Sequence, residues 1–298
     1  MTRTPSFVLG LLFLPATASA QVASSSSTAR PAFEVASVKL NSACGNQRGP
    51  NIRPSPGRLS LSCVSLRRLI STAYGAFADG VIRWVRPEVL GGPAWVDSDL
   101  YDIEAKTGNP ATFEQINGVM LQALLEERFK VEVRREFREM PAYLLTVAKS
   151  GAKLRAAKGA NCVPEDPYGG PPRFGRSEPF LCGRVRETSN NEGKVVEGYD
   201  VSMSDIVNQI LVRYVDRPII DRTGLTGKFD VHLTMLPTIM PKGPVRLNGV
   251  DVGSLPPPSD DDPLVFSFVE QQLGLKLSSG KGPVEFLIIA NAERPSAN

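Results

Sequence analysis

The sequence predicts an α+β protein made of two tandem homologous units, each with the order strand, helix, strand, helix, strand, strand, and joined by a disulfide-bonded loop. Three observations predict this class. Residues 59–148 recur, weakly but in the same order, at 196–290. Helix and strand patterns alternate inside both segments. Four cysteines bracket two stretches that are rich in glycine and proline.

Four matched blocks carry the internal repeat. They are 65–70, 100–103, 125–133 and 141–148 in the first copy, and 202–207, 228–231, 269–277 and 283–290 in the second. Four blocks in one order indicate a duplication, and two copies are too few for a solenoid. The first copy is longer by about nine residues around 79–88, and the second by about 16 residues within 237–263, as is typical of surface loops.

The N-terminal residues have the pattern of a cleavable export signal. Arg3 gives a positive start, an apolar run covers 7–14, and small residues stand before position 21. We therefore expect residues 1–20 to be a signal peptide and 21–31 a flexible leader. The mature chain is expected in the periplasm or outside the cell, with no transmembrane segment after signal cleavage.

The rest of the chain divides into a first unit at 32–150, a Pro/Gly-rich connector at 151–194 and a second unit at 195–298. Capping residues predict four helices, namely 66–75 after Ser65, 113–128 after Thr112 with Gln115, 203–214 after Ser202 with Asp205, and 264–273 after Asp262 and Pro263. Strands are predicted over 33–40, 59–61, 101–105, 130–135 and 142–148, and over 195–201, 228–234, 275–278 and 284–290.

Four cysteines in an exported chain predict two disulfides, for which three pairings are possible. Local pairing, Cys44 with Cys63 and Cys162 with Cys182, is favoured because each pair brackets one loop. Each bond would stabilise the fold by about 3 kcal/mol in the loop-entropy view. A zinc site made of all four thiols is the rival interpretation, although no C-x-x-C pair is present.

Composition and charge exclude several classes of function. A hydrophobic fraction of 42% and a charged fraction of 22% are typical of a globular protein. Loss of Arg3 with the signal lowers the formal net charge from +3 to about +2. No nucleic-acid partner is therefore expected, and we expect an unknown protein or a cell-envelope ligand instead. Alternating charges over 126–139 predict the solvent face of a sheet.

No catalytic motif is recognisable, and no catalytic, cofactor-binding or metal residue is expected. The single histidine, His232, lies on a predicted strand without a partner motif. Two S-x-x-K strings, Ser150 to Lys153 and Ser278 to Lys281, contain glycine and follow predicted strands, which favours turns over a serine nucleophile with its base. Asp221-Arg222-Thr223-Gly224 indicates another turn. The acidic run 260–262 is explained by a solvated loop that ends in a helix cap.

The sequence also resembles the soil-associated exported protein family, which is abundant in Acidobacteria. The residues that carry the resemblance are Phe33-Glu34-Val35-Ala36-Ser37-Val38-Lys39, Pro56-Gly57-Arg58-Leu59, 66–74, Gly91-Gly92-Pro93-Ala94-Trp95 with Tyr101-Asp102-Ile103, 221–230, and 283–298. The resemblance covers nearly the whole mature chain and implies export and the same architecture. The family has no established activity. Related domains are fused to membrane-embedded antirepressor-like sensor peptidases, which implies extracytoplasmic sensing or docking. The helix-strand units more distantly resemble the short N-terminal domains of secretins and TonB-dependent receptors.

Two classes of function stay open. An exported, non-enzymatic binding or interaction module fits the duplication, the loop insertions and the lack of a catalytic set. The alternative is a hydrolase with an unrecognised pair of carboxylates, for which carboxyl groups about 5–10 Å apart across a cleft would be needed.

The insertion in the first copy supplies the candidate partner contact, which consists of Arg83, Trp84 and Arg86. Tryptophan and arginine are enriched at interface hot spots because they give much contact for little lost entropy. The competing interpretation is that Trp84 folds back as a lid on its own core. Trp95, beside Gly91, Gly92 and Pro93, is expected in the core.

Overall fold

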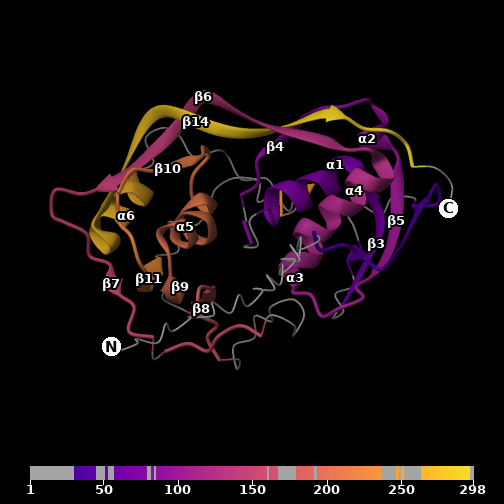
Figure 1. Ribbon diagram of the computed structural model, residues 1–298. Coiled ribbons are helices and arrows are strands. Elements are labelled where there is room, and N and C mark those ends of the chain that lie inside the picture. The colour runs from indigo at the N-terminus through magenta and orange to yellow at the C-terminus, as the bar shows by residue number, and fades with distance from the viewer. Residues whose placement is uncertain are drawn as a thin grey trace, which may run out of the picture.

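The protein is described by a computed structural model that covers residues 30–44, 51–52, 57–78, 82–83, 85–159, 161–166, 179–190, 193–235, 246–247, 250–251 and 263–295. Helices and strands are mixed along the chain, which confirms the α+β class. Figure 1 shows two lobes below one long pair of strands, β6 (Glu132–Val147) and β14 (Leu275–Asn291), which we call the ribbon. The predicted signal peptide and positions 21–29 of the leader fall outside the described residues.

The first lobe contains an antiparallel sheet, with helices between this sheet and the ribbon (Figure 1). In order across the sheet, its strands are β1 (Val35–Leu40), β5 (Leu100–Lys106), β3 (Arg58–Ser65) and β2 (Asn51–Ile52). The helical segments are α1 (Leu66–Ile70), which continues as the π-helix η1 (Ser71–Ala76), the short α2 (Trp95–Ser98), and α3 (Phe113–Gln115), which continues through the π-helix η2 (Ile116–Met120) into α4 (Leu121–Phe129).

The second lobe is built in a similar way. Its antiparallel sheet has the order β7 (Arg155–Ala156), β11 (Phe229–Met235), β9 (Gly193–Val201) and β8 (Val185–Asn190). Its helical segments are α5 (Met203–Asp205), the π-helix η3 (Ile206–Ile210), the 3-10 turn η4 (Leu211–Arg213) and α6 (Pro263–Leu273). A small hairpin of β12 (Arg246–Leu247) and β13 (Val250–Asp251) lies apart from the sheets.

Three of the four predicted helix caps are confirmed. The Ser65 side chain accepts a hydrogen bond from the Arg68 N–H at the start of α1. Thr112 with Gln115, and Ser202 with Asp205, form complete capping boxes in which side chain and backbone satisfy each other. The fourth predicted cap, Asp262, lies outside the described residues.

The ribbon connects the two lobes and completes both of their cores. β6 and β14 run antiparallel, with Met140 opposite Gly282 near the middle. The core of the first lobe contains Leu287 and Ile289 from the far half of β14. The core of the second lobe contains Tyr143 and Leu145 from the far half of β6. Each lobe is therefore completed by a strand segment from the other half of the chain.

Two short strands pair in parallel with the ribbon, one at each end. β4 (Glu88–Gly91) lies beside residues 286–289 of β14, and β10 (Ile219–Asp221) lies beside residues 143–145 of β6. The sheet order is β10-β6-β14-β4. Neither short strand was expected from the sequence. The predicted connector, 151–194, contains β7 and β8, which form the edges of the second lobe's sheet. The duplication and the proposed boundaries stay predictions.

The sequence predicts two shorter strands in place of each ribbon strand, and this is wrong. The expected pairs are 130–135 with 142–148, and 275–278 with 284–290, and Pro141 and Pro283 lie in the gaps between them. In the structure one strand runs through each proline.

The direction of the backbone groups explains why Pro141 is tolerated in β6. The Tyr143 N–H donates to the carbonyl of Pro218 and the Leu145 carbonyl accepts from the Arg222 N–H, on the side away from β14. Backbone groups alternate in direction along a strand. The N–H and C=O groups of every odd-numbered residue from 133 to 147 therefore point away from β14. Pro141 occupies such a position, and its missing N–H removes no bond between the ribbon strands.

Both predicted disulfides are confirmed. Cys44 is bonded to Cys63 with 5.6 Å between their Cα atoms, and Cys162 to Cys182 with 5.0 Å. None of the cysteines is free, so the rival zinc site is wrong. Each bond closes its own loop, the first ahead of the α1 helix and the second between the two lobes.

Candidate interaction surface

The motif residues do not assemble into a catalytic group. His232 is 65% exposed on β11, and its Nδ1 lies 3.1 Å from the Glu197 carboxylate. Ser278 and Lys281 both lie on β14, three positions apart, so their side chains point to opposite faces. The Lys153 ammonium donates to the Gln271 carbonyl at 2.8 Å. Neither S-x-x-K string therefore places a lysine amine beside its serine hydroxyl.

The segment from Asp221 to Gly224 forms the turn that the sequence indicates. Asp221 Oδ1 accepts from the backbone N–H of Thr223 at 2.8 Å and from its hydroxyl at 2.7 Å. Such a bond from a side chain to the backbone two residues on is a common way to stabilise a turn. The acidic run 260–262 lies outside the described residues.

Two carboxylates from distant parts of the chain meet at one arginine. The Arg184 guanidinium lies 2.6 Å from the Glu165 carboxylate and 3.3 Å from that of Glu114, which lies in α3. The three side chains are only 14–25% exposed. The cluster joins the first lobe, the second disulfide loop and the start of β8. Its geometry is that of an ion-pair tie between lobes, in which both carboxylates are engaged by the same cation.

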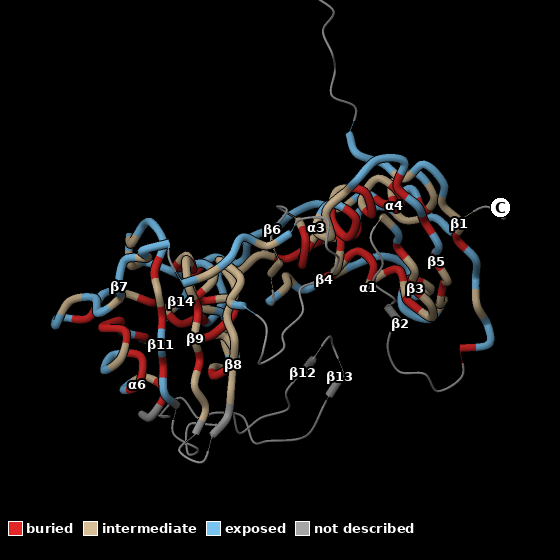
Figure 2. Tube along the Cα trace, turned by 90° about the horizontal axis from the view of Figure 1, so that it is seen from below, coloured by how far each residue is buried: buried red, intermediate tan, exposed pale blue. Residues whose placement is uncertain are grey.

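The middle of the ribbon is exposed, as the alternating charges there predict, but the exposed apolar side chains that it carries are not predicted from the sequence. All β6 side chains from Arg134 to Pro141 are exposed, whereas those of Ala142 and Tyr143 are buried. Figure 2 shows β6 as pale blue between the two lobes. Phe137 is 63% exposed and Met140 is 38% exposed. Two large apolar side chains thus reach solvent at the point where the lobes are joined.

Phe137 lies on the face of the ribbon that carries both cores. Side chains alternate between faces along a strand, so Val133, Phe137 and Tyr143 share one face. Val133 packs against the first core and Tyr143 belongs to the second. At a rise of about 3.4 Å per residue, the two are about 34 Å apart, and Phe137 lies between them.

An arginine network surrounds this phenylalanine. Glu285 of β14 lies directly opposite Phe137 in the ladder. Its carboxylate pairs with Arg135 and, at 3.6 Å, with Arg83. Arg135 also donates to the Tyr74 carbonyl at 3.0 Å. We call Arg83, Arg135, Phe137 and Glu285 the bridge surface.

The predicted partner contact is only partly located. Arg83 joins the bridge surface, and its own N–H donates to the Ala76 carbonyl at 2.8 Å. Arg86 lies against η1 near Gly75. Burial, and then the nearby charge of Arg68, lower the pKa of Arg86 to about 10. Trp84 lies outside the described residues. Trp95, expected in the core, packs against it and lies under Arg294, whose guanidinium carbon is 5.3 Å from the ring centroid.

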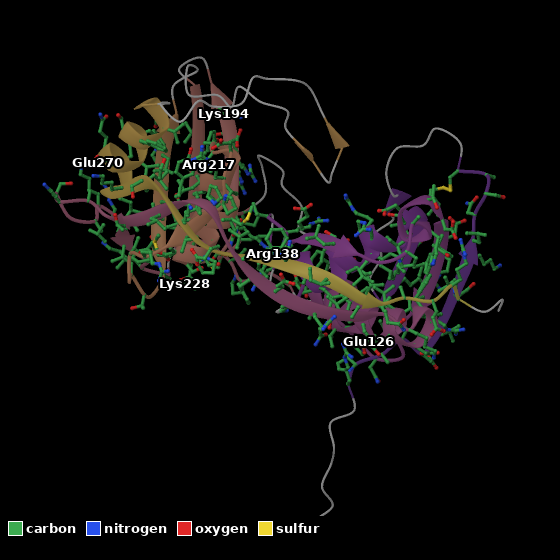
Figure 3. All side chains as sticks on the ribbon, turned by 90° about the horizontal axis from the view of Figure 1, so that it is seen from above. Glu126, Arg138, Lys194, Arg217, Lys228 and Glu270 are labelled. Carbon is green, nitrogen blue, oxygen red and sulfur yellow. A yellow bond between two sulfur atoms is a disulfide. The ribbon has the colours of Figure 1, made fainter. Side chains whose placement is uncertain are left out.

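The opposite face of the ribbon carries a second arginine contact. Arg138, labelled in Figure 3, lies in the middle of the ribbon, which passes in front of both lobes in this view. Its guanidinium carbon is 4.9 Å from the centroid of the Phe286 ring, and its Nε is 2.6 Å from the Glu136 carboxylate. This hydrogen bond is the main reason that the pKa of Glu136 is below its ordinary value.

The part of the chain that the structure describes gives less support to a metal site or a small-molecule site. No group of three or more histidine, cysteine, aspartate or glutamate side chains there could hold a metal ion. A pocket between the N-terminal segment and α4, beside Phe33 and Arg128, has a volume of about 100 Å³. Small-molecule sites are typically about 300–1,000 Å³, so this pocket is too small for one. No described helix is long and apolar enough to cross a membrane.

Comparison with known proteins places the chain in a family without an assigned function. The sequence model of the family described as "Protein of unknown function (DUF3738)" matches residues 67–292. Because this is about three quarters of the 298 residues, the chain belongs to that family. No curated protein and no solved structure matches the chain.

The bridge surface could have been suspected from one sequence signal. Phe137 is an apolar residue inside the run of alternating charges at 126–139. The alternating charges alone predict only the solvent face of a sheet. The signal for a contact site is that one aromatic side chain, Phe137, interrupts a strand of charged residues.

Proposed function

We propose that the protein is an exported, non-enzymatic binding module that docks a protein or another cell-envelope ligand through the bridge surface. The observation that carries this proposal is Phe137, which is 63% exposed on the core-bearing face of the ribbon beside an Arg-Glu-Arg network. Aromatic and arginine side chains are enriched at interface hot spots. The ribbon also joins the lobes, so a ligand bound there contacts the part of the molecule that both lobes share.

Export is supported by two further features. Two disulfides are typical of proteins that fold in an oxidising compartment outside the cytoplasm. The N-terminal sequence has the pattern of a signal peptide. The resemblance to the soil-associated exported family, and more distantly to the short domains of secretins and TonB-dependent receptors, supports extracytoplasmic sensing or docking by association.

Photo-crosslinking tests the location of the contact. A photoreactive phenylalanine analogue at position 137 is expected to form discrete adducts with a ligand when the protein is exported in its host. The matched control is the same analogue at Leu40, which is 64% exposed on β1 in the first lobe. Adducts at position 137 should weaken when Arg83→Ala is added, because Arg83 and Phe137 would contact the same ligand.

Two results would reject the bridge surface as the contact. One is the absence of adducts at position 137. The other is an identical adduct pattern at positions 137 and 40, which would reflect exposure alone. Circular dichroism of each variant shows whether its fold is intact.

The alternative from the sequence, a hydrolase with paired carboxylates, receives no specific support among the described residues. The two carboxylates that meet, Glu114 and Glu165, share Arg184.

A further inference from the structure

We propose that the edge of β6 between Val133 and Glu139 binds an extended peptide of the ligand as an additional antiparallel strand. This inference rests on the proposed function and names the form of the ligand. Among the residues that the structure describes, no strand pairs with this edge, because β10 covers β6 only at residues 143–145. Addition of a strand to an open sheet edge is a common mode of peptide recognition.

The backbone of this edge has the groups that a further strand needs. Odd-numbered positions of β6 turn their N–H and C=O groups away from β14, as the bonds of Tyr143 and Leu145 with the β10 segment establish. The ladder between β6 and β14 is regular from Val133 to Val147, so the alternation holds along the edge. Arg135, Phe137 and Glu139 therefore direct their backbone groups toward the position of the added strand.

The side chains of the edge define a charge pattern. Arg135, Glu136, Arg138 and Glu139 are all exposed, with one arginine and one glutamate on each side of Phe137 in the same chain order. Opposite charges that face each other across an antiparallel pair stabilise it, and like charges destabilise it. A peptide that runs antiparallel to β6 is therefore best matched by the sequence Lys-Glu-Phe-Lys-Glu, with its phenylalanine opposite Phe137.

The pattern also selects one alignment. With this peptide, its first lysine faces Glu139, its first glutamate faces Arg138, its second lysine faces Glu136 and its last glutamate faces Arg135. A shift by one residue moves every side chain of the peptide to the other face and brings like charges together. The predicted ligand is thus an extended segment of alternating charges around one aromatic or apolar residue.

The probe is a capped peptide with Lys-Glu-Phe-Lys-Glu between two threonines, titrated into the protein from residue 21 onward and followed by NMR. The backbone N–H groups of Arg135, Phe137 and Glu139 are expected to shift and to exchange more slowly with solvent, because they gain hydrogen bonds. Those of Glu136 and Arg138 already face β14 and should change less. No shift at the three odd positions would overturn the proposal, and it is the result expected if the charges only protect the edge from aggregation.

Two control peptides of the same composition test sequence and direction. Lys-Lys-Phe-Glu-Glu makes two favourable and two unfavourable pairs in either direction, and should bind about tenfold more weakly. Glu-Lys-Phe-Glu-Lys is matched only in the parallel direction. Equal binding of all three peptides, or tightest binding of the last, would overturn the antiparallel alignment.

A charge exchange on the protein supplies an independent test. Glu139→Lys should weaken binding of the matched peptide about fivefold, because a lysine then faces a lysine. The peptide Glu-Glu-Phe-Lys-Glu should bind Glu139→Lys better than it binds the wild type. A variant that binds both peptides equally would overturn the pairing at this position.

The two proposals fail separately. If crosslinking at position 137 captures a ligand while the peptides produce no shift, the strand addition is wrong and the bridge surface stands. If the peptides bind as expected and no adduct forms at position 137 in the host, the edge is competent but the proposed docking role fails.

Discussion

Gly118 shows how one residue determines a local path of the chain. It lies inside η2 with φ of −101° and ψ of −107°, outside helical values. A Cβ atom at this position would lie 2.4 Å from the Phe77 carbonyl oxygen, which is much closer than a real contact allows. The glycine therefore permits the turn after η1 to approach η2.

The first prediction concerns this contact. Gly118→Ala should lower the free energy of unfolding by about 1–3 kcal/mol, because the backbone of residue 77 must move to admit the methyl group. Gly108→Ala is the matched control, since the atoms nearest to its Cβ would be those of the Glu34 side chain, at 3.4 Å or more. Urea unfolding of both variants is the measurement. Equal stability of the two would contradict the proposed contact.

The second prediction concerns pH. Burial, and then the charge of Glu187, raise the pKa of Tyr214 from 10.0 to about 12. The folded protein then holds a proton that the unfolded chain loses above pH 10, so stability falls as pH rises from about 10 to about 12. Tyr214→Phe should make the decrease of the melting temperature over this range shallower. An unchanged slope would show that Tyr214 does not contribute.

At the scale of elements, the sequence predicts local features well and long-range pairing poorly. The sequence identifies Ser65, Thr112 and Ser202 as caps because their bonds involve residues only three positions away. The continuity of β6 and β14 depends on which side of the strand each proline faces, and this is determined only by pairing. β4 and β10 are short, and they are strands only because the ribbon lies beside them.

The third prediction tests which lobe β14 completes. Leu287 is fully buried in the core of the first lobe although it belongs to the second half of the chain. Leu287→Ala should destabilise the protein by about 2–5 kcal/mol and accelerate amide exchange in α1 and α4 more than in η3. Ile288→Ala, on the opposite and partly exposed face, should have a smaller effect. Faster exchange mainly in the second lobe would contradict the assignment.

The candidate site was harder to predict than the elements. The sequence makes Arg83 a candidate because it neighbours Trp84 in an insertion, and the structure brings it to Glu285, about two hundred positions away in the sequence. The sequence does not distinguish Phe137 as a contact residue, because its exposure depends on its position between two cores. A sequence pattern identifies which face of a strand is apolar, but it does not show where along the strand the supporting core ends.

At the scale of the whole molecule, the two halves of the chain are mutually dependent. Leu287 and Ile289 enter the first core, and Tyr143 and Leu145 enter the second. Arg184 adds an ion-pair tie between the lobes. Neither half contains a complete core on its own.

The fourth prediction follows from this dependence. Residues 21–150 and 151–298, produced separately and oxidised, should each lack a cooperative melting transition, and mixing them should restore one. Each half keeps its own disulfide, so no bond between the halves is needed. Circular dichroism and calorimetry are the measurements. A cooperative transition in either half alone would show that its lobe is self-sufficient.

The exchange of strand segments also determines the order in which the molecule can fold. Single domains usually fold as they emerge, the N-terminal one first. Here the first core needs Leu287, which follows Val133 by about 150 residues; at roughly 5–20 residues per second this is a delay of about 8–30 s. During that time the first half has no native partner for its ribbon strand. During synthesis the first core therefore lacks Leu287 and Ile289 until most of the chain has been made, so this lobe completes its folding only after the second half of the chain is present.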